Sequence, residues 1–239
     1  WTDRQLLTDI TVDHGPVDVL GRFFILADLA ARARGVTLSF GTFDELLAIN
    51  AENRDTWKPV TSMYDVRYCP EGLATDNAFC IFGRDASGKV VATQAARVYR
   101  LTGRSFHDEA TSLRMFYDAP TRDKAPDERC EVTAPIAQSL QGTILVGGAA
   151  WYRPDYRGKQ LSAILPRISR AFAYTRWRTD WTTTLMMEGP MKGNVWQSSG
   201  YTQYEWDLKL FNAPNGNPRC AICWMPPEQL VTDLRQQLL

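Results

Sequence analysis

An apolar run, a basic turn and an amphipathic stretch follow one another in this chain, and this order restricts its fold most. Residues 143–152 read TILVGGAAWY, which is typical of a buried strand. The turn RPDYRGKQ covers 153–160. After it the apolar residues fall on one face of a helix, namely Leu161, Ile164, Leu165, Ile168 and Phe172. Arg167 and Arg170 fall elsewhere on that helix. A strand, a turn and a helix in this order predict a mixed α/β architecture.

The turn before this helix has the chemistry of an anion site. If the helix begins near Arg157, the backbone N–H groups of 158–162 have no intrahelical partner. Such a helix N-terminus attracts phosphate, and Arg157 and Lys159 can add charge-assisted contacts. Gly158 lets the backbone approach a ligand closely. The alternative is a solvated loop that is merely basic.

The N-terminal part predicts two helices and a strand. Apolar residues recur at helical spacing from 16 to 34, and Gly35 ends that helix. Residues 36–40 predict a short strand. Thr42 and Glu45 form a capping box that opens a helix over 43–57.

Residues 77–101 form the clearest hairpin, with turn residues at 85–88. The segment from Gly83 to Lys89 also matches most of a phosphate-binding loop, G-x-x-x-x-G-K. Val90 replaces the serine or threonine of that motif, and a strand follows instead of a helix. We therefore interpret the segment as a turn.

Residues 102–130 are polar and irregular, which is typical of a lid, an insertion or a disordered segment. The later segments predict strands at 130–135, 180–187, 200–211 and 219–225 and a short turn or helix at 194–199. Pro226 and Pro227 introduce a last helix that ends at Leu239.

Composition excludes several classes of protein. Hydrophobic residues make up 44% of the 239 residues and charged residues 23%, as in soluble globular proteins. The formal net charge is zero, so no global field recruits nucleic acid or an anionic membrane. The strip RWRTDW at 176–181 mixes arginine and tryptophan, but no nucleic-acid-binding motif accompanies it.

The five cysteines are an odd number, which favours reduced thiols and a cytoplasmic location. Cys220 and Cys223 form a single C-x-x-C. The two histidines, His14 and His107, are the only candidates to complete a zinc site, so we expect no metal.

The strand that ends in x-Pro-Asp-Tyr-Arg-Gly-Lys, its helix, the next strand and the segment GNVWQSSGY together resemble the GNAT superfamily of N-acetyltransferases. The resemblance covers the cofactor-binding core, about residues 78–210. The family signature at the turn is R/Q-x-x-G-x-G/A. Arg157 fits its first position, whereas Gln160 and Ser162 stand where glycine is usual.

This resemblance implies an α/β (α+β) fold with a mixed, mainly antiparallel central sheet flanked by helices. It implies a single domain over 1–239, with an N-terminal helix and strand at 1–57 and a C-terminal strand and helix at 211–239. The insertion lies at about 102–130.

The resemblance also implies acetyl-CoA, or another acyl-CoA, as co-substrate. The strand that ends at Tyr152 would pair with the pantetheine arm, and N–H groups near Trp151 and Tyr152 would polarise the thioester carbonyl. Asn194 would lie toward the cofactor. The remaining cofactor-binding residues implied are Arg153, Arg157, Gly158, Lys159, Gln160, Leu161 and Ser162.

The family's usual general acid, a tyrosine, falls on Trp196, which cannot protonate a thiolate. Tyr201 or Tyr204 would substitute, or solvent would. A base must deprotonate the incoming ammonium, and Glu131 and Glu188 are the candidates. Both carboxylates are equally open to an ordinary role as exposed or capping groups.

The sequence therefore predicts an acyltransferase that moves an acetyl group from acyl-CoA to a primary amine by direct attack in a ternary complex. One alternative is a GNAT-fold module that binds CoA, or nothing, without catalysis. Another is an enzyme of the acyl-homoserine-lactone-synthase type, because RCEVTAP followed by YRGK is similar to that branch. We expect a small-molecule or peptide amine as acceptor, no nucleic-acid or membrane partner, and a possible homodimer.

Overall fold

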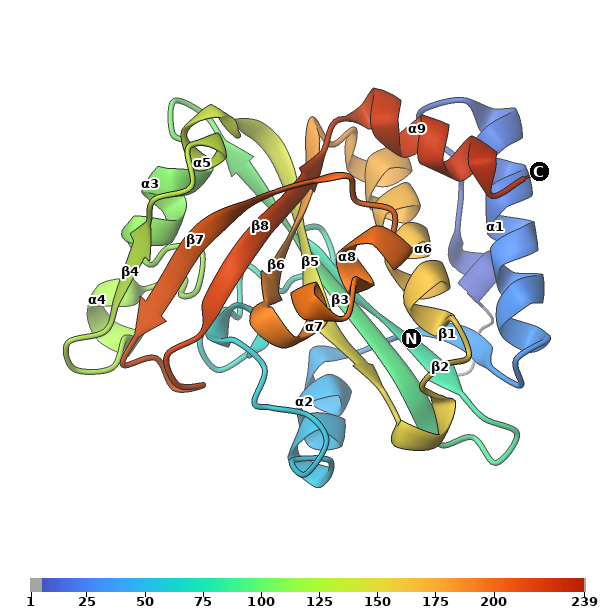
Figure 1. Cartoon of the computed structure of the whole chain (residues 1–239), viewed down its shortest axis with the longest axis horizontal. Helices are drawn as coiled ribbons and strands as arrows, with labels where there is room; N and C mark the ends of the chain where they lie inside the picture. The colour runs from blue at the N-terminus through green and yellow to red at the C-terminus, as the bar shows by residue number, and fades with distance from the viewer. Residues whose placement is uncertain (1–5, 239) are drawn as a thin grey trace.

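The computed structural model describes residues 6–238. In them, eight strands form one sheet in the order β1-β2-β3-β5-β6-β8-β7-β4 (Figure 1). The strands are β1 (Thr37–Gly41), β2 (Ala78–Arg84), β3 (Val90–Leu101), β4 (Arg129–Val132), β5 (Gly142–Tyr152), β6 (Trp181–Met187), β7 (Gln203–Phe211) and β8 (Arg219–Met225). Neighbours pair antiparallel except β5 and β6, which are parallel. This confirms the mixed, mainly antiparallel sheet.

Helices cover both faces of the sheet. They are α1 (Val17–Arg32), α2 (Phe43–Glu52), α3 (Phe106–Thr111), α4 (Pro120–Asp123), α5 (Ile136–Ser139), α6 (Leu161–Trp177), α7 (Glu188–Lys192), α8 (Val195–Ser198) and α9 (Pro227–Gln236), with 3-10 turns η1 (Leu6–Asp9), η2 (Ser62–Tyr64) and η3 (Pro154–Tyr156). None of the helices in residues 6–238 has the length and apolar character needed to cross a bilayer.

Two hydrophobic cores lie on opposite faces of the sheet. Alternate side chains of β3 pack into one core or the other, because successive side chains of a strand point to opposite faces of the sheet. Ala96 and Val98 belong to the core beneath α1, α6 and α9, whereas Ala95 and Tyr99 belong to the core beneath α2 and α3.

The two cysteines of the C-x-x-C also separate in this way. They lie on β8, where residues three apart point to opposite faces. Cys223 is in the core beneath α6 and Cys220 is in the other core.

The predicted N-terminal helix, first strand and hairpin are confirmed. The second helix ends at Glu52 rather than at residue 57. Thr42 Oγ1 accepts a hydrogen bond from the Glu45 N–H at 3.2 Å, as the capping box requires. The Glu45 carboxylate instead pairs with Arg84 of β2 at 2.6 Å.

The segment over 102–130 is largely irregular, as predicted, but it is ordered and holds the short helices α3 and α4. Helix α3 begins with a full capping box between Ser105 and Asp108. Phe106 and Tyr117 are fully buried in the core beneath α2 and α3. The Tyr117 hydroxyl donates to the buried Glu128 carboxylate at 2.8 Å, which fixes the end of the segment.

Two other expectations need correction. Arg167 and Arg170 were placed away from the apolar face of α6, but they are 6% and 2% exposed, because α8 and α9 cover them. Helix α9 ends at Gln236, and Leu239, the expected end, lies outside the described residues.

Candidate active site at the parting of two strands

Strands β5 and β6 run side by side and then separate. Their ladder joins Ile144–Gly147 to Trp181–Thr184, and it ends at Gly147 and Thr184. Strand β5 continues to Tyr152 and β6 to Met187. Figure 1 shows the two strands diverging toward α7 and η3, with α7 and α8 in front. The parting strands leave unpaired backbone edges that face one another.

A β-bulge lies on β5 at this point. Strand β3 pairs Thr93 with Trp151 and Ala95 with Gly148, so Ala149 and Ala150 together face one residue of β3. Ala149 has φ of +48°, and its carbonyl accepts from Thr93 Oγ1 at 2.8 Å. The bulge turns the strand where the ladder with β6 has already ended. It therefore places the distorted backbone directly before Trp151 and Tyr152, the residues whose N–H groups the resemblance had implied.

A cavity of about 60 Å³ lies between the parting strands and α6. Its lining includes Gln94, Gly148, Tyr152, Ser169, Arg170 and Tyr201. Several of these residues carry a buried polar atom without a hydrogen-bond partner among the described residues: Gln94 Oε1, the Tyr152 hydroxyl, Ser169 Oγ, and Arg170 Nε and Nη1. Buried polar groups are normally paired, so this concentration marks a place that suits a polar ligand.

The basic turn adjoins the outer end of β5. Gly158 has φ of +79° and Gln160 has φ of +60°, so both adopt the left-handed conformation. Gln160 is the N-cap of α6, and the buried Leu161 fixes the first turn of that helix to the core. Glycine adopts this conformation without steric cost, whereas glutamine does not. The turn nevertheless forms with glutamine at position 160.

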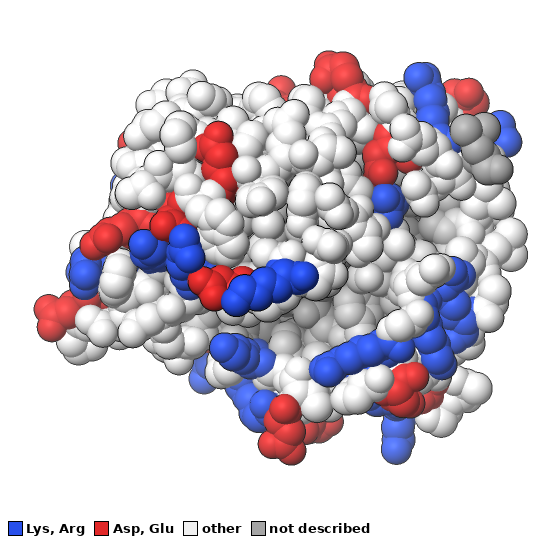
Figure 2. All heavy atoms as spheres, in the orientation of Figure 1, with Lys and Arg blue, Asp and Glu red and all other residues white. Residues whose placement is uncertain are grey.

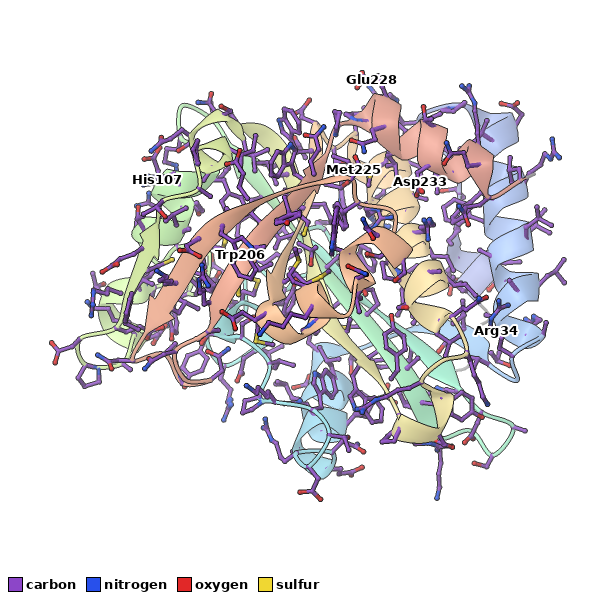
Figure 3. The ribbon with its side chains drawn as sticks, in the orientation of Figure 1. Arg34, His107, Trp206, Met225, Glu228 and Asp233 are labelled. Carbon is purple, nitrogen blue, oxygen red and sulfur yellow. The ribbon has the colours of Figure 1, made fainter. Side chains whose placement is uncertain are left out.

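Arg34 joins this turn from the end of α1. Its Nε donates to the Lys159 carbonyl at 2.6 Å, and its Nη2 donates to Gln160 Oε1 at 2.9 Å. A surface hollow is lined by Arg34, Gly158, Lys159 and Gln160. Figure 3 shows Arg34 beside the loop that precedes α6. Figure 2 shows Lys and Arg side chains on the rim of a hollow in the lower half of the same face.

Two of the predicted cofactor-binding arginines already have partners within the protein. The exposed Arg157 donates to the carbonyls of Tyr152 and Thr56, at 3.1 and 3.2 Å. The Arg153 guanidinium pairs with Asp155 at 2.7 Å and with Asp85 at 3.1 Å. The structure therefore brings 157–162 together at the turn and commits Arg153 to two carboxylates.

Trp151 and Asn194 lie farther from the cavity lining. The Trp151 ring stacks on Trp57, with 5.5 Å between centroids, and its Nε1 donates to Thr56 Oγ1. The exposed Asn194 caps α8 in a left-handed conformation with φ of +54°. The roles implied for both residues stay predictions.

The two candidate carboxylates lie in different places. Glu131 is on β4, the outermost strand, which β6, β8 and β7 separate from β5. It is exposed and pairs with Arg129 at 3.1 Å. Glu188 is the first residue of α7, directly after β6, and it pairs with Arg219 at 3.0 Å. The structure brings Glu188, but not Glu131, to the end of a parting strand.

Tyr201, the candidate general acid, lines the cavity. It is 4% exposed, and burial raises the pKa of its hydroxyl to about 12. Trp196, at the usual position of the family's acid, packs edge-on against Tyr204, with 4.8 Å between centroids. Of the three positions 196, 201 and 204, only Tyr201 lines the cavity.

Sequence reasoning missed Arg34, Gln94, Ser169 and Arg170. Gln94 is a polar residue inside a largely apolar strand, and this pattern could have identified it as a candidate site residue. The glycine pair at 147–148 inside a strand was a signal for the bulge. Arg34 and Arg170 reach the site only through contacts between distant segments.

No protein-family model and no curated protein matches the sequence. Solved structures similar to the chain include aminoglycoside acetyltransferase AAC(6')-Ib with coenzyme A and kanamycin, at 13% identity and a TM-score of 0.46, covering 81% of this chain and 96% of that one. Spermidine/spermine N-acetyltransferase SpeG from Vibrio cholerae is 9% identical, covering 83% and 97%, with a TM-score of 0.47. Ribosomal-protein-S5-alanine acetyltransferase from Vibrio fischeri is 9% identical, covering 80% and 93%, with a TM-score of 0.49. Likeness at this level carries no argument about activity, which has to come from the site itself.

Proposed function

We propose that this protein is a CoA-dependent N-acyltransferase that transfers an acetyl group from acetyl-CoA to a primary amine. The observation that carries the proposal is the parting of β5 and β6 beside the basic turn that opens α6. A narrow polar chain that ends in a phosphate matches this combination of an unpaired strand edge and a helix N-terminus.

The residues present fit CoA. The strand edge beyond Gly147 offers backbone groups to the amides of a pantetheine arm, and the orphaned polar atoms of the cavity offer further partners. The turn offers the N–H groups before Ser162, with positive charge from Arg34 and Lys159, to a pyrophosphate. When bound, acetyl-CoA supplies the activated acetyl group as a thioester.

The chain's own groups would then act on the reaction as follows. The N–H groups of the bulge at Ala149 and Ala150 would polarise the thioester carbonyl. Glu188 would accept a proton from the incoming amine, directly or through water. Tyr201 would hold its proton in the cavity and donate a hydrogen bond there.

The size of the cavity favours a short acyl group. The cavity has room for only a few water molecules. A two-carbon acetyl group needs less room than the long acyl chain of a lactone-synthase-type enzyme. We therefore propose acetyl as the group transferred.

The experiment is calorimetric titration with acetyl-CoA and CoA, followed by a thiol-release assay with a panel of small amines and peptides. We expect binding of both nucleotides and turnover with at least one amine. Absence of binding at millimolar acetyl-CoA would refute the proposed function.

Trp196 favours a second candidate, a module that binds CoA without catalysis. An indole cannot protonate a thiolate, and the Trp196 ring is packed against Tyr204. Binding of CoA without thiol release for any amine would favour the module, and turnover would reject it.

A further inference from the structure

Arg170 of α6 is a buried cation whose hydrogen-bonding capacity is only partly used. Its side chain is 3% exposed. Its Nη2 donates to the Ser199 carbonyl, whereas Nε and Nη1 have no partner among residues 6–238. Burying an ion costs several kcal/mol unless it is paired and hydrogen-bonded. The two unpartnered nitrogens of the Arg170 guanidinium therefore suit a ligand that accepts hydrogen bonds.

The charge of Arg170 is also only partly compensated. The carboxylate nearby is Asp233 of α9, which Arg167 holds with two hydrogen bonds of 2.8 and 3.0 Å. Arg170 lies 3.6 Å from the same carboxylate. Because two guanidinium groups share one carboxylate, positive charge remains on the side of Arg170.

This charge borders the cavity at the parting of β5 and β6. Arg170 contributes to the lining together with Gly147, Gly148 and Tyr201. Its Cζ lies 4.6 Å from the centroid of the Tyr201 ring, and this contact fixes the plane of the guanidinium. The side of the cavity that α6 lines is therefore positive, and it suits a small anion.

We propose that Arg170 stabilises the thiolate of CoA as the acetyl group leaves. This inference rests on the proposed function. The amine nitrogen forms a bond to the carbonyl carbon, the carbon–sulfur bond breaks, and its electron pair stays on sulfur. The amine proton passes to the base, and the guanidinium N–H groups hold the anionic sulfur.

The same arrangement explains how the chain can act with tryptophan at position 196. Burial raises the pKa of Tyr201 to about 12. An ordinary thiol has a pKa well below this value, so proton transfer from Tyr201 to the thiolate is uphill. A fixed cation needs no proton transfer, because it stabilises the sulfur as an anion until solvent protonates it.

The first test is the titration of CoA bound to the wild-type protein, followed by the ultraviolet absorbance of the thiolate. The complex with desulfo-CoA, which lacks the sulfur, corrects for tyrosine absorbance. We expect the thiol of bound CoA to titrate about one unit or more below free CoA. A thiol that titrates like free CoA overturns the inference, even if every variant fails to fold.

The second test compares variants of α6. Arg170→Gln removes the charge and should return the thiol titration to that of free CoA, with kcat about 100-fold lower and KM for acetyl-CoA little changed. Arg170→Lys should retain part of the titration shift. Arg176→Gln, at a partly exposed arginine of the same helix, is the matched control and should match the wild type.

The outcomes separate the two proposals. If the wild-type protein binds no CoA, the proposed function fails and this inference fails with it. If it binds CoA and Arg170→Gln leaves the thiol titration unchanged, the inference fails while the proposed function stands.

Discussion

Asp233 and Arg167 form a two-point ion pair, with hydrogen bonds of 2.8 and 3.0 Å, that fastens the C-terminal helix α9 to α6. Figure 3 shows Asp233 on the side of α9 that faces α6. Arg167 Nη1 also donates to the Ser198 carbonyl at 2.7 Å. One carboxylate near the C-terminus thus organises the turn between α8 and β7, which leads to Tyr201.

Replacing Asp233 by asparagine should destabilise the fold strongly. The change leaves two buried guanidinium groups without their carboxylate, and breaking a buried pair costs about 3 kcal/mol or more. Urea unfolding would measure the loss. Glu228→Gln, at an exposed carboxylate of the same helix, is the control and should cost at most about 1 kcal/mol. Equal losses in both variants would contradict a central role for Asp233.

Arg34→Gln should weaken CoA binding without unfolding the protein. The variant loses the charge beside the turn and its hydrogen bonds to Lys159 and Gln160. A charge-assisted contact is worth about 1.5 kcal/mol or more, so we expect roughly a tenfold rise in Kd. Calorimetry at two salt concentrations would measure it, with Arg22→Gln on α1 as control. An unchanged Kd for CoA would show that Arg34 does not contribute to CoA binding.

The stability of the protein should fall on the alkaline side. Burial raises the pKa of Cys69 to about 11, from an ordinary value of 9.0, and that of Tyr201 to about 12, from 10.0. Between the unfolded and folded values the unfolded chain releases protons that the folded chain keeps. The free energy of unfolding therefore holds up to about pH 9 and decreases toward pH 12.

Urea midpoints measured at intervals across this range would check the direction. Tyr201→Phe removes one of the titrating hydroxyls and should make the decline shallower. A midpoint that rises or stays level above pH 9 would contradict the burial of these groups.

The sequence was sufficient to predict those elements that are stabilised by contacts between residues close in the chain. The hairpin of β2 and β3 and the cap at Thr42 depend on contacts within a few residues. The turn before α6 could be predicted for the same reason, because its N–H groups and charges are adjacent in the chain, and its role as an anion site stays a prediction.

Contacts between distant segments were not visible in the sequence. The buried Tyr117 hydroxyl accepts a hydrogen bond from Ser62, 55 residues away, and contacts of this kind order the segment over 102–130. Arg170 is polar in the helical pattern, yet Ser199 and Asp233 make it part of the interior. Glu131 looked close to the central strands because it precedes β5, but strand order places it at the outer edge.

Gly158→Ala should destabilise the protein through the backbone alone. Gly158 has φ of +79°, and a Cβ added there meets no atom within 4 Å. The left-handed conformation costs an alanine about 1 kcal/mol, with no steric clash to add to it. Gly21→Ala is a matched control, since a Cβ at Gly21 also meets no atom within 4 Å, but Gly21 lies inside α1. There the same substitution should stabilise by about 0.8 kcal/mol, because alanine favours a helix. Urea unfolding of the two variants should therefore shift in opposite directions, and a shift of both in one direction would contradict the left-handed turn that opens α6.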